Sequence, residues 1–274
     1  MQAVEFLAQP KGEVEMVLYF SGTGNSKFAA EFIADEIGDQ CVSLNYVLKH
    51  KEPPEFASRK PFVICAPIHA GRFPAVVMKL LSKAVFSGPR KVYFVATLSS
   101  KSCSVAASLK ELAQKKHLEF GGLFFVTMPD NYVLGGNVPD HHEAEYQVKY
   151  VVVPRLLEVA YVIKNDDVMY EDNANPVVSA FSGSVNAVFN KFTVTSERFV
   201  VSDDCYVCGK CVEACPVNNI IIINGDPIFL KKCVNCYACI NRCPRKAINI
   251  GKRTENVNRY VCPEYKEWKA KGIV

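Results

Sequence analysis

Eight of the twelve cysteines fall in two copies of one short pattern near the carboxy-terminal end. Each copy has the form C-x2-C-x2-C-x3-C-P, so that three closely spaced cysteines are followed by a fourth that precedes a proline. The copies are Cys205, Cys208, Cys211 and Cys215, then Cys233, Cys236, Cys239 and Cys243. Three thiolates on so tight a loop can wrap one side of an iron–sulfur cube, while a fourth ligand arrives from elsewhere. The pattern therefore predicts two [4Fe–4S] clusters.

In this motif the fourth cysteine of each copy binds the cluster of the other copy. The predicted ligand sets are Cys205, Cys208, Cys211 and Cys243 for one cluster, and Cys233, Cys236, Cys239 and Cys215 for the other. The two copies form an internal repeat, because an offset of 28 residues relates every cysteine of the first to its counterpart. A duplicated half-domain is indicated. Between the copies, residues 220–230 are predicted to form a hairpin that turns at Asn224-Gly225.

The alternative for these eight cysteines is a pair of structural zinc sites, which would need paired C-x2-C knuckles that close two tetrahedra. A third evenly spaced cysteine and the proline after the fourth fit that scheme poorly. The other four cysteines have no partner at a metal-binding spacing and are predicted to be structural thiols. They are Cys41, Cys65, Cys103 and Cys262.

The net charge of +4 comes from the carboxy-terminal end, where residues 201–274 hold 12 Lys and Arg against 7 Asp and Glu. These basic residues interleave with cysteines and do not form the dense stripe typical of nucleic-acid binding, so no nucleic-acid partner is expected. No apolar stretch reaches the roughly 18 residues that span a bilayer. The first ten residues lack the basic region of a signal peptide. We expect no membrane span and a cytoplasmic location, where disulfides are rare.

The amino-terminal part of the chain alternates between strand and helix patterns. Strands are predicted over 14–20, 41–44, 62–68, 91–97 and 122–128. Helices are predicted over 25–37, 74–83 and 103–117. This alternation is typical of an α/β fold with a five-stranded parallel sheet wound on both faces. In such sheets ligands bind beyond the carboxyl ends of the strands, where the strand order reverses. The loops after the first, third and fourth strands should therefore carry the site.

The loop after the first strand is rich in hydroxyl groups and glycine and leads directly into a helix. It contains Ser21, Gly22, Thr23, Gly24, Asn25 and Ser26. Backbone N–H groups at a helix start attract phosphate, and four of these side chains can add donors around a phosphate monoester. Lys27 stands where a dinucleotide fingerprint needs its third glycine, and the spacing of a nucleotide P-loop is absent. The alternative is an ordinary capped helix start.

These residues make the chain resemble the flavodoxins, whose first loop binds the phosphate of FMN, over residues 14–165. Residues 199–252 are similar to the bacterial two-cluster ferredoxins at all eight cysteines. The whole chain resembles the family of fused flavodoxin–ferredoxin proteins. The resemblance implies a flavodoxin-like FMN-binding domain over 1–165 with sheet order 2-1-3-4-5. It further implies a linker or docking segment over 166–198 and a small α+β ferredoxin-type domain over 199–274.

Two further loops complete the expected flavin site. The loop after the third strand would pass along the isoalloxazine edge, and the loop after the fourth offers hydroxyls and amides to the pyrimidine ring. The expected FMN contacts here are Pro67, Ile68, His69, Ala70, Gly71, Thr97, Leu98, Ser99 and Ser100. Lys101 near N1 would favour an anionic reduced flavin, and its alternative role is that of a solvated loop lysine.

The segment between the two motif regions is expected to help cover the flavin. The loop after the fourth strand lacks the aromatic residue on which flavodoxins stack the ring, so Tyr132 or Phe181 is a candidate, with core packing as the alternative. A helix that begins near Asp140 should kink or restart at Pro154. Residues 177–192 are apolar enough to form another helix.

Two cofactor types in one chain indicate a function. A flavin accepts two electrons in single steps and each cluster carries one, which predicts an electron carrier that serves redox protein partners. The alternatives are an FMN-dependent reductase of a small molecule with the clusters as an internal wire, and a redox sensor with structural clusters. No second Gly-rich strand–turn–helix is present for NAD(P)H, and no acid, base or nucleophile stands out as catalytic.

Overall fold

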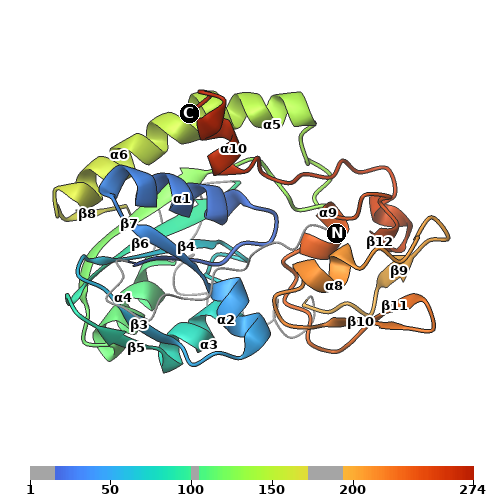
Figure 1. Cartoon of the computed structure of the whole chain (residues 1–274), viewed down its shortest axis with the longest axis horizontal. Coiled ribbons are helices and arrows are strands. Elements are labelled where there is room, and N and C mark those ends of the chain that lie inside the picture. Colours follow the sequence, from blue (N-terminus) through green and yellow to red (C-terminus); the bar gives the residue numbers. More distant parts are fainter. Residues whose placement is uncertain (1–15, 100–104, 172–193) are drawn as a thin grey trace.

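The computed structural model describes residues 16–99, 105–171 and 194–274 (Figure 1). Its amino-terminal part is a parallel sheet with helices on both faces, and the residues from 199 onward form a smaller unit beside that sheet. Ser100, Lys101, Cys103, Phe181 and the predicted helix over 177–192 lie outside the described residues. No helix within these ranges is both long and apolar enough to cross a membrane.

Six parallel strands make up the main sheet, in the order β2-β1-β4-β6-β7-β8. The first five are the five predicted strands, and their order confirms the predicted arrangement 2-1-3-4-5. Their bounds are Met16–Tyr19 for β1, Gln40–Ser43 for β2, Phe62–Pro67 for β4, Lys91–Leu98 for β6 and Glu119–Thr127 for β7. The sixth, β8 (Met169–Tyr170), was not predicted. It lies in the stretch expected to be a linker, and two exposed residues leave no periodic pattern to detect.

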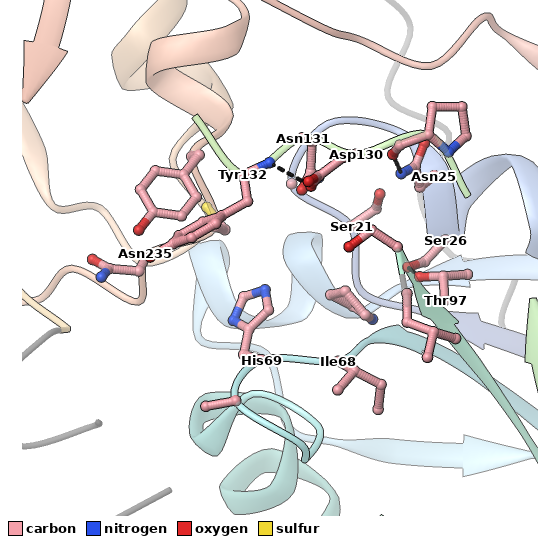
Figure 2. Close-up of a pocket in the computed structure, with 18 residues that line it drawn as sticks. Ser21, Asn25, Ser26, Ile68, His69, Thr97, Asp130, Asn131, Tyr132 and Asn235 are labelled. Carbon is pink, nitrogen blue, oxygen red and sulfur yellow. Dashed lines mark hydrogen bonds between the residues drawn. The ribbon is translucent and has the colours of Figure 1, made fainter. Parts of the chain in front are cut away.

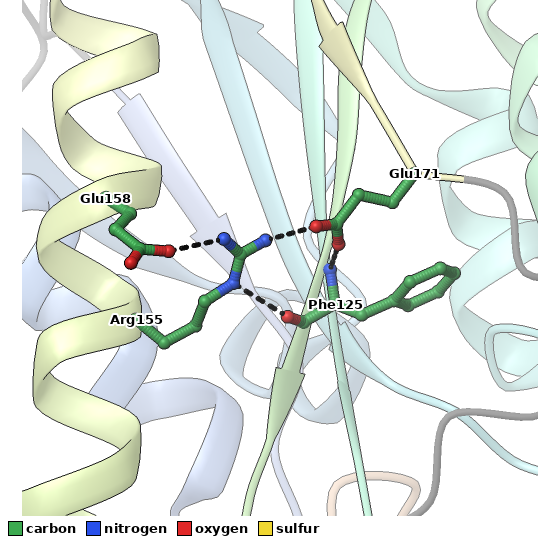
Figure 3. A network of polar contacts seen from close by, with 4 residues as sticks. All are labelled: Phe125, Arg155, Glu158 and Glu171. Carbon is green, nitrogen blue, oxygen red and sulfur yellow. Dashed lines mark hydrogen bonds and ion pairs between the residues drawn. The ribbon is translucent and has the colours of Figure 1, made fainter.

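A polar network supports this short edge strand (Figure 3). Strand β8 pairs with β7 only at Gly122 and Leu123, so the backbone of Phe125 lies beyond its reach. The Glu171 carboxylate accepts the Phe125 N–H at 2.8 Å, and Arg155 Nε donates to the Phe125 carbonyl at 3.2 Å. Arg155 also pairs with Glu171 at 2.7 Å. Side chains thus satisfy backbone groups that an edge strand would otherwise leave open.

Alternate residues of each strand face opposite layers of the fold. Val17 packs beneath α1 (Asn25–Ile37) and α6 (Val153–Lys164), whereas its neighbour Leu18 packs in the opposite core. The opposite layer consists of α2 (Leu44–His50), α3 (Ala75–Lys83), α4 (Ala106–Lys115) and a small parallel sheet of β3 (Glu55–Ala57) and β5 (Val85–Ser87). Figure 1 shows the two layers above and below the sheet. This is the predicted doubly wound arrangement.

Helix boundaries follow the local chemistry of the sequence. Helix α1 begins after Gly24 and ends before Gly38, which have φ angles of 106° and 67°. Both lie in the left-handed region that glycine adopts without steric cost. The long helix of the connection is interrupted as predicted near Pro154, because α5 (His141–Gln147) passes through a π-helical turn before α6 begins. A helix tolerates proline in its first turn, where the missing backbone N–H would have no partner within the helix.

The cysteine-bearing unit repeats in its backbone as well as in its sequence. Helix α8 (Lys210–Ala214) and α9 (Ala238–Asn241) start 28 residues apart, as do strands β10 (Ile220–Ile223) and β12 (Ile248–Ile250). Strand β10 pairs with β11 (Asp226–Phe229) through the predicted turn, where Asn224 and Gly225 both have positive φ. Strand β12 pairs with β9 (Phe199–Val201) and leads into a short 3-10 helix over Gly251–Thr254. The duplicated half-domain is confirmed.

The carboxy-terminal end of the chain returns to the flavodoxin-like sheet. Helix α10 (Tyr265–Ala270) packs across α1, where Phe28 makes edge-on ring contacts with Tyr265 and Trp268. The Tyr265 hydroxyl donates to Asp35 at 2.7 Å. The end of the predicted range 199–274 therefore packs on the first domain, and this packing ties the two units together.

Candidate functional site

The predicted cysteine ligands gather in two groups. Four thiols, including one from the first motif copy, line one small cavity and are called the inner set: Cys215, Cys233, Cys236 and Cys239. Burial is the main cause that raises the pKa of the three second-copy thiols, and the nearby charge of Cys215 adds to the rise in each. The structure thus places Cys215 with the second copy, as the predicted exchange of fourth ligands requires.

The remaining four are called the outer set: Cys205, Cys208, Cys211 and Cys243. Burial raises the pKa of Cys211, and the charges of Cys205 and Cys208 raise it further. A hydrogen bond with Cys208 is the main cause that raises the pKa of Tyr206, and the charge of nearby Cys243 adds to the rise. Cys208 is exposed, whereas Cys211 is buried. The outer set therefore reaches the surface at one corner.

Backbone amides point at the two exchanged thiols in equivalent ways. The N–H of Asn219 donates to Cys215 Sγ at 3.2 Å, and the N–H of Ala247 donates to Cys243 Sγ at 3.3 Å. Such donors favour the thiolate, which is the form that binds iron. In the described residues, no three His, Cys, Asp or Glu side chains converge on a point where one metal ion could sit. A zinc tetrahedron would bring four thiolates to about 2.3 Å from one ion, whereas a cube spreads them over four irons.

A cavity of about 330 Å³ lies at the carboxyl ends of β1, β4 and β6 (Figure 2). Most of the predicted flavin contacts line it, namely Ser21, Gly22, Asn25, Ser26, Pro67, Ile68, His69, Ala70, Thr97, Leu98 and Ser99. Tyr132, a candidate cover for the ring, lines it too. Thr23, Gly24 and Gly71 do not. The cavity thus occupies the place where parallel sheets bind ligands.

The first loop is held rigid by contacts with distant segments. Asn45 accepts the Ser21 N–H at 2.9 Å and donates to the Ser21 carbonyl at 2.8 Å. The hydroxyls of Ser26 and Thr97 lie 2.7 Å apart and link the first turn of α1, directly after the first loop, to the end of β6. A loop fixed in this way loses little conformational freedom when it binds a ligand.

Three residues of the first loop have structural partners that the sequence did not reveal. Thr23 accepts a hydrogen bond from Asn131 at 2.7 Å, and its carbonyl accepts the N–H of Cys262. Gly24 lies against Cys262, whose thiol is buried. The Asn25 side chain, expected to donate toward phosphate, donates one N–H to the Pro129 carbonyl and accepts from the Tyr260 hydroxyl at 2.9 Å. Its amide has a second N–H, and the residue lines the cavity.

The cysteine-bearing unit forms one wall of the same cavity. Asn235, Cys236 and Tyr237 line it, opposite the loops of the sheet. The Tyr132 and Tyr237 rings lie 5.6 Å apart, and Figure 2 shows Tyr132 and Asn235 on the side of the cavity that faces His69. A Cβ atom on Gly22 would overlap the Cys236 carbonyl, so the first loop and the inner set are in direct contact. No motif in either segment indicates this approach, because it depends on how the two units dock.

His69 gives the cavity a pH dependence that can be measured. Burial lowers the pKa of the His69 imidazole to about 4, below the value of about 6.5 in an unfolded chain. As the pH falls, the unfolded state therefore binds the proton before the folded state does. The neutral imidazole's contribution to the free energy of unfolding is fully present above about pH 6.5 and is lost as the pH falls toward 4. From pH 7 to 5 we expect the free energy of unfolding to fall by about 1–2 kcal/mol, reduced by the remaining solvent contact of the side chain.

Urea unfolding of the flavin-free chain at several pH values tests this expectation. His69→Gln should flatten the pH dependence by that amount, while His141→Gln, an exposed histidine on α5, should leave it unchanged. An equal change of unfolding free energy with pH in the wild type and in His69→Gln would contradict the lowered pKa of His69.

Comparison with known protein families finds two matches. Residues 16–122 match a family described as flavodoxin domain, and residues 204–248 match a family described as 4Fe-4S dicluster domain. This order of domains is the fused flavodoxin–ferredoxin arrangement. A comparison with curated protein sequences gave no match.

Several solved structures have weak similarity to the amino-terminal part. A putative flavoprotein from Bacteroides uniformis is 16% identical, with 42% of this chain and 91% of that chain covered and a TM-score of 0.34. The two-electron reduced flavodoxin of Megasphaera elsdenii is 15% identical, with coverages of 55% and 98% and a TM-score of 0.34. The Trp repressor binding protein from Bacillus subtilis is 10% identical, with coverages of 56% and 96% and a TM-score of 0.32.

Proposed function

We propose that this chain, an electron-transfer protein in which a flavodoxin domain precedes a 4Fe–4S dicluster domain, passes electrons between one FMN and two [4Fe–4S] clusters and exchanges them with external redox proteins. One observation carries the proposal. Cys236 lines both the cavity of the inner set and the cavity that holds most of the predicted flavin contacts. A cluster ligand would therefore form part of the flavin site.

The residues of the larger cavity fit FMN. Its volume of about 330 Å³ lies in the range of about 300–1,000 Å³ that is usual for small-molecule sites. Ser21, Gly22 and Ser26 would hold the phosphate at the start of α1, where backbone N–H groups and the helix dipole favour an anion. The loops after β4 and β6 would line the isoalloxazine, and Tyr132 would cover it. Tyr237, whose buried hydroxyl has no protein partner among the described residues, offers a further polar group.

The two cysteine sets fit iron–sulfur clusters. The inner set would hold the cluster beside the flavin, and the outer set would hold the cluster nearer the surface. Each set contains three closely spaced cysteines and the exchanged fourth, with an amide donor on the exchanged sulfur. The donors are thiolates only, which suits iron–sulfur chemistry.

When bound, FMN supplies a two-electron carrier that also reacts in single-electron steps, and the clusters supply one-electron carriers. The chain's own residues set the distances. Gly22 permits contact between the first loop and the inner set. Cys236 and Tyr237 line both cavities and so form the boundary between them. Exposed Cys208, which follows the exposed Tyr206 and Val207, marks the corner where an external protein can approach the outer set.

Anaerobic purification followed by analysis and reduction tests the proposal. We expect one FMN with about eight irons and eight labile sulfides per chain, as two cubes require. After chemical reduction, electrons should pass to cytochrome c or a ferredoxin in stopped-flow mixing. A reductase would instead turn over one small acceptor quickly, and a sensor would do neither. Absence of labile sulfide, or failure to retain FMN, would contradict the proposal.

A further inference from the structure

Tyr237 stands between the two cofactor cavities. It follows the inner-set ligand Cys236 directly in the sequence, and these two residues are the only ones among the described residues that line both cavities. Its ring contacts Tyr132 from the flavodoxin side, with centroids 5.6 Å apart. Tyr237 therefore belongs to the cysteine-bearing unit and borders both the region assigned to FMN and the cavity of the inner set.

The backbone of Tyr237 is unusual for its residue type. Its φ angle is 54°, in the left-handed region that disfavours side chains with a Cβ atom. The position 28 residues earlier in the repeat is Gly209, with a φ angle of 76°. The fold thus requires a left-handed residue at this point of both copies. Glycine meets that requirement in the first copy, and a bulky tyrosine occupies it in the second. Such an outlier indicates a role for the side chain, because strain persists where the surroundings over-determine it.

The hydroxyl of Tyr237 is buried without a partner. The residue is 7% exposed, and the hydroxyl makes no hydrogen bond with any residue in the described part of the chain. Buried hydroxyls are nearly always paired, because loss of hydration without a replacement bond is unfavourable. The side-chain amide of Asn241, one helical turn away, donates to the backbone carbonyl of Tyr237 and not to its hydroxyl. Because Tyr237 borders both cavities, the missing partner points to a group bound in one of them, and the ring contact with Tyr132 favours the flavin side.

We propose that Tyr237 is a flavin-binding residue contributed by the cluster domain, with its hydroxyl hydrogen-bonded to a polar atom of FMN. This inference rests on the proposed function, since it takes FMN as the occupant of the larger cavity. It makes the flavin site a composite of both domains. FMN retention then depends on the second domain, and the strained tyrosine is kept because glycine at this position would leave the flavin without one wall and one hydrogen bond.

The test is FMN affinity in variants that keep the clusters. Tyr237→Phe removes only the hydroxyl. The flavin-free form of this variant should bind FMN about 3- to 10-fold more weakly, as expected for one lost hydrogen bond. Tyr237→Gly copies the first repeat and suits the left-handed backbone, so it should fold while binding FMN more weakly still. Affinity is read from the quenching of FMN fluorescence, and iron and sulfide contents confirm that both clusters remain.

Tyr161→Phe is the matched control, because this tyrosine is 68% exposed on α6 and lines neither cavity. It should leave the dissociation constant unchanged. If Tyr237→Phe binds FMN as the wild type does, and instead shifts the electron paramagnetic resonance signal of the reduced clusters, the hydroxyl serves the inner cluster and the proposal is overturned. If the wild-type chain itself binds no FMN, the proposed function fails, and the role of Tyr237 fails with it.

Discussion

Cys215→Ala is expected to remove the cluster beside the flavin and to leave the outer cluster in place. The reason is the exchange of fourth ligands, in which Cys215 belongs to the first motif copy by sequence but lines the cavity of the second. The variant should lose about half of its iron and labile sulfide, four of each per cube. Electron flow from reduced flavin to the remaining cluster should fall steeply, because the inner set no longer connects them.

Cys243→Ala supplies the matched comparison. It should lose the same amount of iron but keep the cluster at the inner set, so fast flavin-to-cluster transfer should survive while transfer to an external protein is impaired. Rapid-mixing absorbance at flavin and cluster wavelengths separates the two variants. Cys41→Ala, at a cysteine in β2 outside both sets, should keep its full iron content. If Cys215→Ala retained the flavin-coupled cluster and lost the outer one, ligation within each motif copy would be the correct assignment.

Gly22→Ala is expected to separate the two domains at the first loop. A Cβ atom at this position would overlap the backbone carbonyl of Cys236, and backbone cannot move aside as a flexible side chain can. Overpacking of this kind costs about 1–3 kcal/mol, so FMN should bind about 5- to 150-fold more weakly. Without FMN, the melting temperature should fall and amide hydrogen exchange at residues 235–237 should speed up.

Measurements on the flavin-free form keep this test specific to docking, since an added methyl could also touch the phosphate. Gly71→Ala is a useful control. A Cβ atom there would meet nothing within 4 Å, although its φ of 80° carries the cost of a left-handed alanine, about 1 kcal/mol. It should lower stability slightly and leave exchange at 235–237 unchanged. Wild-type exchange in Gly22→Ala would show that the contact with Cys236 is not tight in solution.

The secondary-structure elements and the chemistry of each half could be predicted from local patterns in the chain. Cysteine spacing indicated the ligand sets because cubane ligation needs a tight loop, a constraint local to a few residues. Short apolar runs located the five strands of the predicted sheet, and glycines at both ends of α1 marked its limits. Both signals lie within one segment of the sequence. The repeat of 28 residues could be recognised from the cysteine positions alone, and equivalent residues of the two copies, such as Gly209 and Tyr237, both have positive φ angles.

Contacts between residues from distant segments could not be predicted, because they depend on how the folded elements pack. The wall of Asn235, Cys236 and Tyr237 on the flavin cavity arises from docking of two units, and no local pattern encodes a docking geometry. The Asn25 side chain likewise meets Pro129 and Tyr260, which approach it from far along the chain. Strand β8 was missed because two exposed residues have no periodicity, and the Arg155–Glu171 pair that supports it joins two separate segments. Local forces select each element, whereas the free energy of packing distant surfaces selects their neighbours.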